Sequence, residues 1–384
     1  MSNLEQFRAK IAVVGAGLWS QGWHLPQLHS QANVKIVAIV EMCQHPRSTL
    51  VKKLLSVDEL KVVYAAPVFS SIDDLLASGL DLDGVIVATN HASHADIAMK
   101  VMDAKLHVLC EKPMTTYVEE AKLLIEASAS NLGKVFLVNN SANYRPKAAY
   151  IHDQISKGRL GEIHHVSSYF HTPLEWLFED PANVGWVQPV GNMVGNGFCW
   201  GQMSHTLAWV YKMTSLTPVK VHAFLTCSER TGADVVASIN VFCSNGATIS
   251  ISGLANVPGD RKHIGNTIAG SKGVLRYSGS AHGKEPDEGR MEWTMKDGQG
   301  ANEVIEGFEF ENLNTNTGTD GTEGVDGTEG EGVLWPESVL SFIDACLGKD
   351  LQYIGADATV GYKAVATIDA IYRSARSGMV EEIV

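Results

Sequence analysis

A glycine-rich turn directly after a short apolar run constrains the fold of this chain more than any other feature. The run KIAVV leads into Gly15 and Gly17, and the next three residues are Leu18, Trp19 and Ser20, which completes the pattern G-x-G-x-x-S. Gly15 permits a tight strand-to-helix turn, and Gly17 lets a pyrophosphate approach the backbone. The third position needs only a small side chain, which Ser20 supplies. The pattern predicts a dinucleotide-binding βαβ unit with the pyrophosphate at the helix N-terminus.

A carboxylate follows at the place where this motif uses one. Glu41 ends the next apolar segment, VKIVAIVE, 24 residues after Gly17. A carboxylate there can accept hydrogen bonds from ribose hydroxyls, and it repels a 2′-phosphate, so NAD is favoured over NADP. Arg47 lies nearby and could accept such a phosphate, which keeps NADP as the less favoured alternative.

Strand and helix patterns alternate over the first part of the chain, which predicts a parallel sheet with right-handed crossovers. After about residue 145, strand patterns follow one another across Gly- and Asn-rich turns, as in an antiparallel or mixed open sheet. We therefore expect an α/β protein with two domains. Residues 1–142 form a doubly wound Rossmann domain, and residues 143–384 form an α+β domain with a large open sheet.

Composition narrows the function classes. The net charge of −13 and the absence of a basic run argue against nucleic acid or an anionic membrane as partner. The six cysteines lack metal-ligand spacing, so we expect reduced thiols, no metal site and a cytoplasmic protein. No apolar segment reaches membrane-spanning length. Residues 311–332 are acidic and rich in Gly and Thr, which is typical of a surface loop.

Several further motifs follow in a fixed order. ATNHASHADIA (88–98) is similar to the segment A-T-P-x-x-x-H, with Asn90 in place of the usual proline. Glu111, Lys112 and Pro113 form an E-K-P tripeptide. Later segments are NYRPKAAYIHDQISKGRLGEI, IAGSKGVL and SARSG. In this order and spacing, the chain resembles the Gfo/Idh/MocA oxidoreductase family, which includes glucose–fructose oxidoreductase and inositol dehydrogenase, over nearly its whole length.

The resemblance implies a nicotinamide cofactor and a sugar, polyol or cyclitol substrate. It also implies that the open sheet mediates assembly into a homodimer or homotetramer. Lys112 is implied to lie near the nicotinamide and the reacting hydroxyl, where it would hydrogen-bond the substrate oxygen. The cofactor-binding residues that we expect are Gly15, Gly17, Leu18, Trp19, Glu41, Thr89, Asn90, His94, Glu111 and Lys112.

The segment GNGFCWGQMSH (195–205) resembles the family pattern G-G-G-x-x-x-D-x-G-x-H. His205 matches the histidine, but Gly201 stands where the acid is usual, and Ala208 replaces a second common acid. We expect His205 to be a catalytic acid/base or a substrate ligand, the alternative being a histidine packed within a helix. Gln202 could supply a neutral hydrogen bond in place of the missing carboxylate.

Additional residues are candidates for a substrate pocket. Tyr144 and Arg145 follow a strand end, and Trp176 and Trp186 lie in an aromatic-rich segment where exposed rings would pack on a sugar. His171 (with Glu175) could replace the missing acid. Three functions remain open: an NAD-dependent dehydrogenase, an NAD-tethered glycosidase that oxidises, eliminates and re-reduces, and a non-enzymatic NAD-binding regulator. The intact E-K-P tripeptide and His205 argue against the regulator, and we favour the dehydrogenase.

Overall fold

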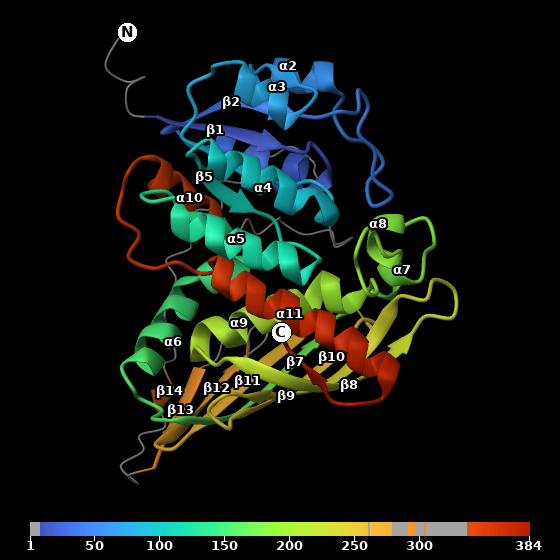
Figure 1. Ribbon diagram of the computed structural model, residues 1–384, viewed down its shortest axis with the longest axis vertical. Coiled ribbons are helices and arrows are strands. Elements are labelled where there is room, and N and C mark those ends of the chain that lie inside the picture. The colour runs from blue at the N-terminus through green and yellow to red at the C-terminus, as the bar shows by residue number, and fades with distance from the viewer. Residues whose placement is uncertain (1–7, 260–261, 279–290, 297–302, 305–335) are drawn as a thin grey trace. The chain divides into compact units, whose positions relative to one another are not determined.

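A computed structural model describes residues 8–259, 262–278, 291–296, 303–304 and 336–384 (Figure 1). The chain forms two compact units. The described residues up to Arg145, together with 336–362, form the first unit. Those between Pro146 and Val304, together with 363–384, form the second. The acidic 311–332 segment lies outside the described residues.

The first unit is built on a six-stranded parallel sheet in the order β3-β2-β1-β4-β5-β6. The strand order reverses between β1 and β4, which places the topological switch point, and therefore the ligand crevice of such sheets, at their carboxyl ends. This is the predicted Rossmann arrangement. The strands are β1 (Ala9–Val14), β2 (Val34–Val40), β3 (Val68–Phe69), β4 (Gly84–Val87), β5 (His107–Cys110) and β6 (Phe136–Val138).

Helices connect these strands as the alternating pattern predicts. Ser71 caps its helix by accepting a hydrogen bond from the backbone N–H of Asp74. A second helix, opened by a capping box of Ser56 and Glu59, was not predicted. The helices are α1 (Leu25–His29, after a π-helical turn Ser20–His24), α2 (Val57–Tyr64), α3 (Ile72–Ala77), α4 (His94–Asp103) and α5 (Val118–Ser130).

Helix α10 (Glu337–Cys346) completes the first unit, although the sequence placed it in the second domain. It packs on β5 and β1. A Cβ atom added at Gly84 of β4 would lie 2.7 Å from the ring of Phe342 and 2.8 Å from Sγ of Cys346. The glycine thus allows the close approach of α10, whose apolar face covers the sheet.

The described residues of the second unit contain a nine-stranded sheet in the order β14-β13-β12-β11-β7-β10-β9-β8-β15. β7 and β10 are parallel and the other neighbouring pairs are antiparallel, which confirms the mixed sheet. The strands are β7 (Ile163–His171), β8 (Pro218–Cys227), β9 (Asp234–Cys243), β10 (Thr248–Leu254), β11 (His263–Gly270), β12 (Gly273–Ser278), β13 (Met291–Met295), β14 (Glu303–Val304) and β15 (Glu381–Glu382).

The two faces of this sheet differ. α9 (Ser204–Thr214) packs on β7, and α6 (Pro146–Ser156) packs on α9. In the second-unit part of α11 (Ala358–Ser377), Ser374 accepts a hydrogen bond from the backbone of Ala223 on β8. The opposite face exposes Tyr169, Phe224 and Phe242. Strand alternation therefore separates a helix-covered face from an open one.

Two one-turn helices, α7 (Glu175–Phe178) and α8 (Val184–Val187), lie between β7 and α9 in the chain. Among the described residues, no helix combines the length and apolar character needed to cross a lipid bilayer.

Candidate functional site

The glycine-rich turn has the form that its sequence predicts. Gly15 has a φ of +89°, and a Cβ atom there would lie 2.5 Å from the carbonyl oxygen of Ala88. At Gly17 an added Cβ would meet no atom within 4 Å. Ser20 is fully buried, and its hydroxyl donates to the carbonyl of Gly15. The turn is thus closed beneath Gly15 and open above Gly17, which is the space that a dinucleotide pyrophosphate requires.

Glu41 is fixed beside this turn. Its Oε2 accepts a hydrogen bond from the backbone N–H of Ala16 at 2.8 Å, and its Oε1 accepts one from Cys43 at 2.8 Å. Each carboxylate oxygen keeps a second lone pair, so the group can still accept ribose hydroxyls. The residues of the turn and Glu41 therefore fit a bound NAD. Leu18 is half-buried, whereas Trp19 at the start of the helix is exposed.

Glu111 follows β5 and is the centre of a buried hydrogen-bonded cluster. Its Oε1 accepts hydrogen bonds from Nε2 of His24 at 2.7 Å and Nδ2 of Asn139 at 2.6 Å. Its Oε2 accepts the backbone N–H of Lys112 at 3.1 Å. Burial alone would raise the pKa of Glu111, but the hydrogen bonds from His24 and Asn139 outweigh it and hold the pKa at about 2. The carboxyl group is therefore an anion at neutral pH.

Lys112 is buried beside this anion, before a cis bond to Pro113. Burial lowers its pKa to about 8, and the charge of Glu111 opposes the change. A lysine with this pKa exchanges its proton near neutral pH, as a general acid or base must. His94 lies on the other side of the turn, with Nδ1 2.9 Å from the carbonyl oxygen of Pro113. Nε2 of the same ring is 3.2 Å from the carbonyl oxygen of Thr89. Burial lowers the pKa of His94, and a neutral imidazole donates to one of these two carbonyls.

The loop after β4 joins the same carboxyl edge. Thr89 lies against the glycine-rich turn, since its Cγ2 would be 2.9 Å from a Cβ atom added at Gly15. The next residue, Asn90, is exposed. His91 was not singled out from the sequence, although it lies within the ATNHASH motif. Burial lowers its pKa to about 3, with further contributions from His94 and Lys112. A neutral imidazole therefore neighbours Lys112.

Tyr144 does not have the pocket role predicted for it. The side chain is 5% exposed, and its hydroxyl donates to the carbonyls of Val138 and Ala356 at 3.1 and 2.9 Å. Its ring also packs on Gly355. These contacts make Tyr144 a structural residue of the first unit. Arg145, which follows it, is half-buried.

The second predicted cluster lies in the other unit. A π-helical turn, Cys199–Met203, carries half-buried Gln202 and leads into α9, which carries half-buried His205. The backbone of this turn is anchored by Asp234, whose Oδ2 accepts the N–H of Cys199 at 2.8 Å. Asp234 is 1% exposed and also accepts the hydroxyl of Tyr372. Sequence reasoning missed Asp234, since nothing in its local segment marks it.

The structure explains the two missing acids near His205. A Cβ at Gly201 would lie 3.3 Å from the ring of Phe178 and 3.5 Å from that of Trp186. Ala208 is fully buried in the core. Aromatic packing thus takes the space of the first acid, and the second would be a buried charge. The same contact brings Trp186 to the turn that precedes His205.

The remaining substrate-binding candidates of the second unit are His171 on β7 and Trp176 on α7. His171 alternates with Phe170 on β7, and it lies on the open face, where its Nε2 is 2.9 Å from Oγ of Ser252. Because α9 covers the opposite face, His171 cannot substitute for an acid beside His205, and this expectation is corrected. Trp176 on α7 is 44% exposed, as expected for an available aromatic surface.

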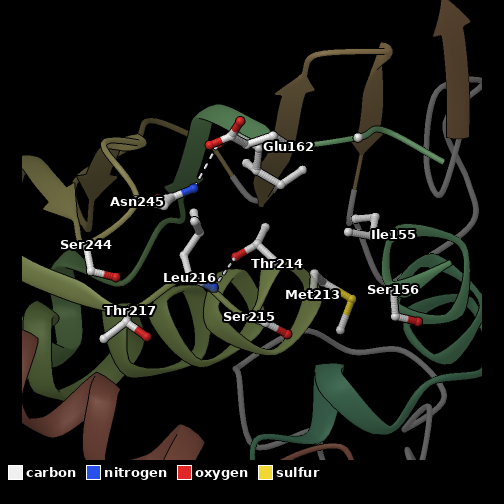
Figure 2. A pocket seen from close by; sticks show the side chains of 12 residues that line it. Ile155, Ser156, Glu162, Met213, Thr214, Ser215, Leu216, Thr217, Ser244 and Asn245 are labelled. Carbon is white, nitrogen blue, oxygen red and sulfur yellow. Dashed lines mark hydrogen bonds between the residues drawn. The ribbon is translucent and has the colours of Figure 1, made fainter. Parts of the chain in front are cut away.

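A cavity of about 490 Å³ in the second unit contains none of the predicted residues. Figure 2 shows it between the ends of α6 and α9 and the β9–β10 turn. Its polar groups are largely satisfied within the chain: Asn245 donates to the carbonyl of Ile163, and Thr214 accepts the backbone N–H of Leu216. Glu162 is the charged residue in the lining. This cavity is not the predicted substrate site.

Two family sequence models match this chain, one over each part of it. Residues 9–140 match the sequence model of the Gfo/Idh/MocA oxidoreductase family, NAD-binding Rossmann fold, and residues 148–276 match that of the Gfo/Idh/MocA C-terminal domain. An uncharacterized oxidoreductase of Schizosaccharomyces pombe is 32% identical over 167 residues, which cover 42% of this chain and 41% of that protein. Glucose-6-phosphate 3-dehydrogenase of Bacillus subtilis is 25% identical over 161 residues, 42% of each chain.

The chain thus spans about half the length, or less, of these curated relatives. Among solved structures, an inositol dehydrogenase homologue from Azotobacter vinelandii, complexed with NAD⁺, aligns over 98% of this chain and 97% of its own, with a TM-score of 0.73 and 19% identity. That likeness supports the two-part fold. With both family regions matched in order, the chain belongs to the Gfo/Idh/MocA oxidoreductase family.

Proposed function

We propose that the protein is an NAD-dependent dehydrogenase that oxidises a secondary alcohol of a sugar, glycoside or cyclitol. The observation that carries this proposal is Lys112, buried next to anionic Glu111 at the carboxyl edge of the dinucleotide-binding sheet. The names of the similar proteins, which include a glucose-6-phosphate 3-dehydrogenase and an inositol dehydrogenase homologue, support the substrate class.

The residues of the first unit have distinct tasks in this proposal. The Gly15–Gly17 turn holds the pyrophosphate, and Glu41 accepts the ribose hydroxyls, which favours NAD over NADP. Bound NAD would supply a nicotinamide C4 that accepts a hydride. Lys112, with a pKa of about 8, accepts the proton of the substrate hydroxyl. Once protonated, it stabilises negative charge on the substrate oxygen in the reverse reaction.

For the second unit, taken by itself, we propose that His205 and Gln202 bind hydroxyl groups of the substrate, with His205 able to accept a proton. Trp186 packs against the turn that carries Gln202 and precedes His205, and Trp176 offers an exposed ring for an apolar sugar face. We also propose that the open face of the nine-stranded sheet is covered by a second copy of the chain.

An NAD-tethered glycosidase is the less favoured alternative. That reaction needs an additional base next to the oxidised carbon, and the sequence offers His171, Glu175 and Tyr144 for it. Tyr144 is buried and bonded to backbone carbonyls, while His171 lies on the open face of its sheet. Of the three, exposed Glu175 at the start of α7 is the base that this alternative retains.

The first experiment monitors NADH absorbance while the protein and NAD meet sugars, glycosides and inositols, with released sugar assayed in parallel. We expect sustained NADH formation with one class. Lys112→Ala should lower kcat/KM about 10³-fold with NAD affinity retained, because the hydroxyl proton loses its acceptor. Lys112→Arg should be equally inactive, since guanidinium does not deprotonate.

The pH profile gives a second test of Lys112. Its neutral form is the proton acceptor, so kcat/KM for alcohol oxidation should rise with pH through about 8 and then level off. Normal turnover by Lys112→Ala, or a profile flat between pH 7 and 9, would contradict the assignment. Released sugar with no net NADH would support the glycosidase instead.

A further inference from the structure

We propose that His24 is a positioning residue for Lys112, acting through Glu111 to hold the Glu111–Lys112–Pro113 turn in register with the dinucleotide-binding helix. The consequence for catalysis rests on the function proposed above for Lys112. The positional claim concerns only the first unit and is testable without turnover.

The carboxylate of Glu111 accepts hydrogen bonds from three donors. His24 and Asn139 share Oε1 of Glu111, at 2.7 and 2.6 Å, while the backbone N–H of Lys112 takes Oε2 at 3.1 Å. His24 is fully buried, and the other members are less than 10% exposed. A buried carboxylate with fixed donors on both oxygens has one orientation, because any rotation would leave a donor unsatisfied.

The two side-chain donors to Glu111 come from separate elements of the first unit. His24 ends the π-helical turn that begins at Ser20, directly after the glycine-rich turn. Asn139 follows β6, and its Oδ1 in turn accepts the hydroxyl of Ser338 from α10 at 2.6 Å. The carboxylate therefore connects the helix that would receive the pyrophosphate with the turn that carries Lys112.

Hydrogen bonds hold the backbone on both sides of the Lys112 side chain. The backbone N–H of Glu111 is held by the carbonyl of Val87 at 2.8 Å, so the sheet still fixes residue 111. The next N–H, that of Lys112, is held by the Glu111 side chain, and the Pro113 carbonyl is held by His94. Since the side chain of Lys112 starts between these two anchors, the orientation of Glu111 sets its starting direction.

A histidine with only a packing role would have different consequences. Its replacement by an apolar side chain of similar size would lower stability but would leave the Lys112 backbone and its chemistry unchanged. A positioning role instead requires a donor at this place. His24→Gln keeps an N–H that can reach Glu111, whereas His24→Met removes the donor and fills a similar volume.

The experiment uses the full chain with NAD and measures amide hydrogen exchange at Lys112 by mass spectrometry. In His24→Met we expect protection of this amide to fall at least about tenfold, with kcat lowered about 10- to 100-fold and NAD affinity within about threefold of wild type. His24→Gln should restore protection and most of kcat. Asn139→Ala, which removes the second donor to Oε1, should change both quantities in the same direction.

The matched control is His107→Met. His107 is also buried in the first unit and accepts the N–H of Val135 at 3.1 Å, but it lies at the opposite end of β5. This variant should lose stability and protection at Val135 and should leave Lys112 protected. The proposal is overturned if Lys112 stays protected in both His24→Met and Asn139→Ala, or if His24→Gln fails to restore what His24→Met loses.

The exchange readout also separates this inference from the proposed function. If no alcohol is oxidised by the wild-type protein, but His24→Met still exposes the Lys112 amide, the proposed function fails and the positional claim is supported. If wild type is an active dehydrogenase and His24→Met turns over at the same rate, the function is supported and the positioning role is wrong.

Discussion

Gly15 and Gly17 occupy one turn, yet a methyl group would meet different surroundings at the two positions. Gly15 has a positive φ, and its methyl group would collide with the backbone of Ala88; above Gly17 there is open space. We expect Gly15→Ala to lower the free energy of unfolding by about 3 kcal/mol. Gly17→Ala should leave stability within about 0.5 kcal/mol of wild type and weaken NAD binding about tenfold or more, since the methyl group would stand in the way of the pyrophosphate.

Urea unfolding and NAD titration of both variants check this pair. Wild-type NAD affinity in Gly17→Ala would show that the pyrophosphate does not approach this residue. The two glycines were identified from sequence because their roles depend on backbone conformation, which local sequence reveals.

Residues that act through distant partners were harder to predict. Glu111 and Lys112 were found through a short motif, but His24 lies 87 positions before Glu111, and Ser338 lies 199 positions after Asn139. No periodicity marks such pairs, because only the folded sheet brings them together. Tyr144 shows the opposite error: a polar aromatic residue after a strand end suggested a pocket, and its hydroxyl instead holds two carbonyls.

At the scale of elements, Asp234 on β9 holds the turn that leads into α9 and His205. Burial raises the pKa of this carboxyl group, and the hydrogen bonds from Tyr372 and Cys199 oppose the shift. Because the pKa is higher in the folded state, the contribution of Asp234 to stability falls as pH rises from its ordinary value of 3.8 through the raised one.

Substitutions at Asp234 separate charge from hydrogen bonding. Asp234→Asn can still accept from Cys199 and donate to the Tyr372 oxygen, so we expect its unfolding free energy within about 1 kcal/mol of wild type at pH 7. Asp234→Ala leaves both partners unsatisfied and should cost about 3 kcal/mol. Thermal and urea unfolding measure both; equal losses in the two variants would mean that the charge itself is required.

The elements that sequence patterns predicted best are those with strong periodicity. The buried strands β1 and β2 and the succession of strands after about residue 145 occur where expected. α2 was missed although Ser56 and Glu59 form a recognisable capping box. The sequence did not show on which face of the second sheet the His171 side chain lies. A strand pattern reveals the alternation of side chains but not which face the helices will cover.

For the whole molecule, the open face of the nine-stranded sheet leads to a prediction about assembly. Phe224 is 63% exposed and Phe242 is 47% exposed on neighbouring strands of this face. We expect a homo-oligomer at micromolar concentration, and Phe224→Glu with Phe242→Glu should shift it toward the monomer, because buried unpaired charges oppose association. Leu132→Glu, at an 89% exposed site of the first unit, is the control and should leave the oligomer unchanged.

Sedimentation velocity distinguishes these outcomes. A monomeric wild-type protein would contradict the prediction, as would an oligomer that the double variant leaves intact. The two-part architecture itself was predicted from the switch between alternating and consecutive strand patterns. The assignment of α10 to the first unit was not predicted, because the sequence of an amphipathic helix does not show which sheet the helix will cover.

The discontinuity of the first unit has a consequence for how the protein folds during synthesis. The six strands of its sheet leave the ribosome early, but α10, which covers Gly84 of β4 and supplies Ser338, is made only after strands β7 to β14 of the second unit. Until then, part of the sheet's apolar surface is uncovered, and such surfaces are prone to aggregation. The core of the first unit therefore closes only after the chain has been synthesised beyond α10.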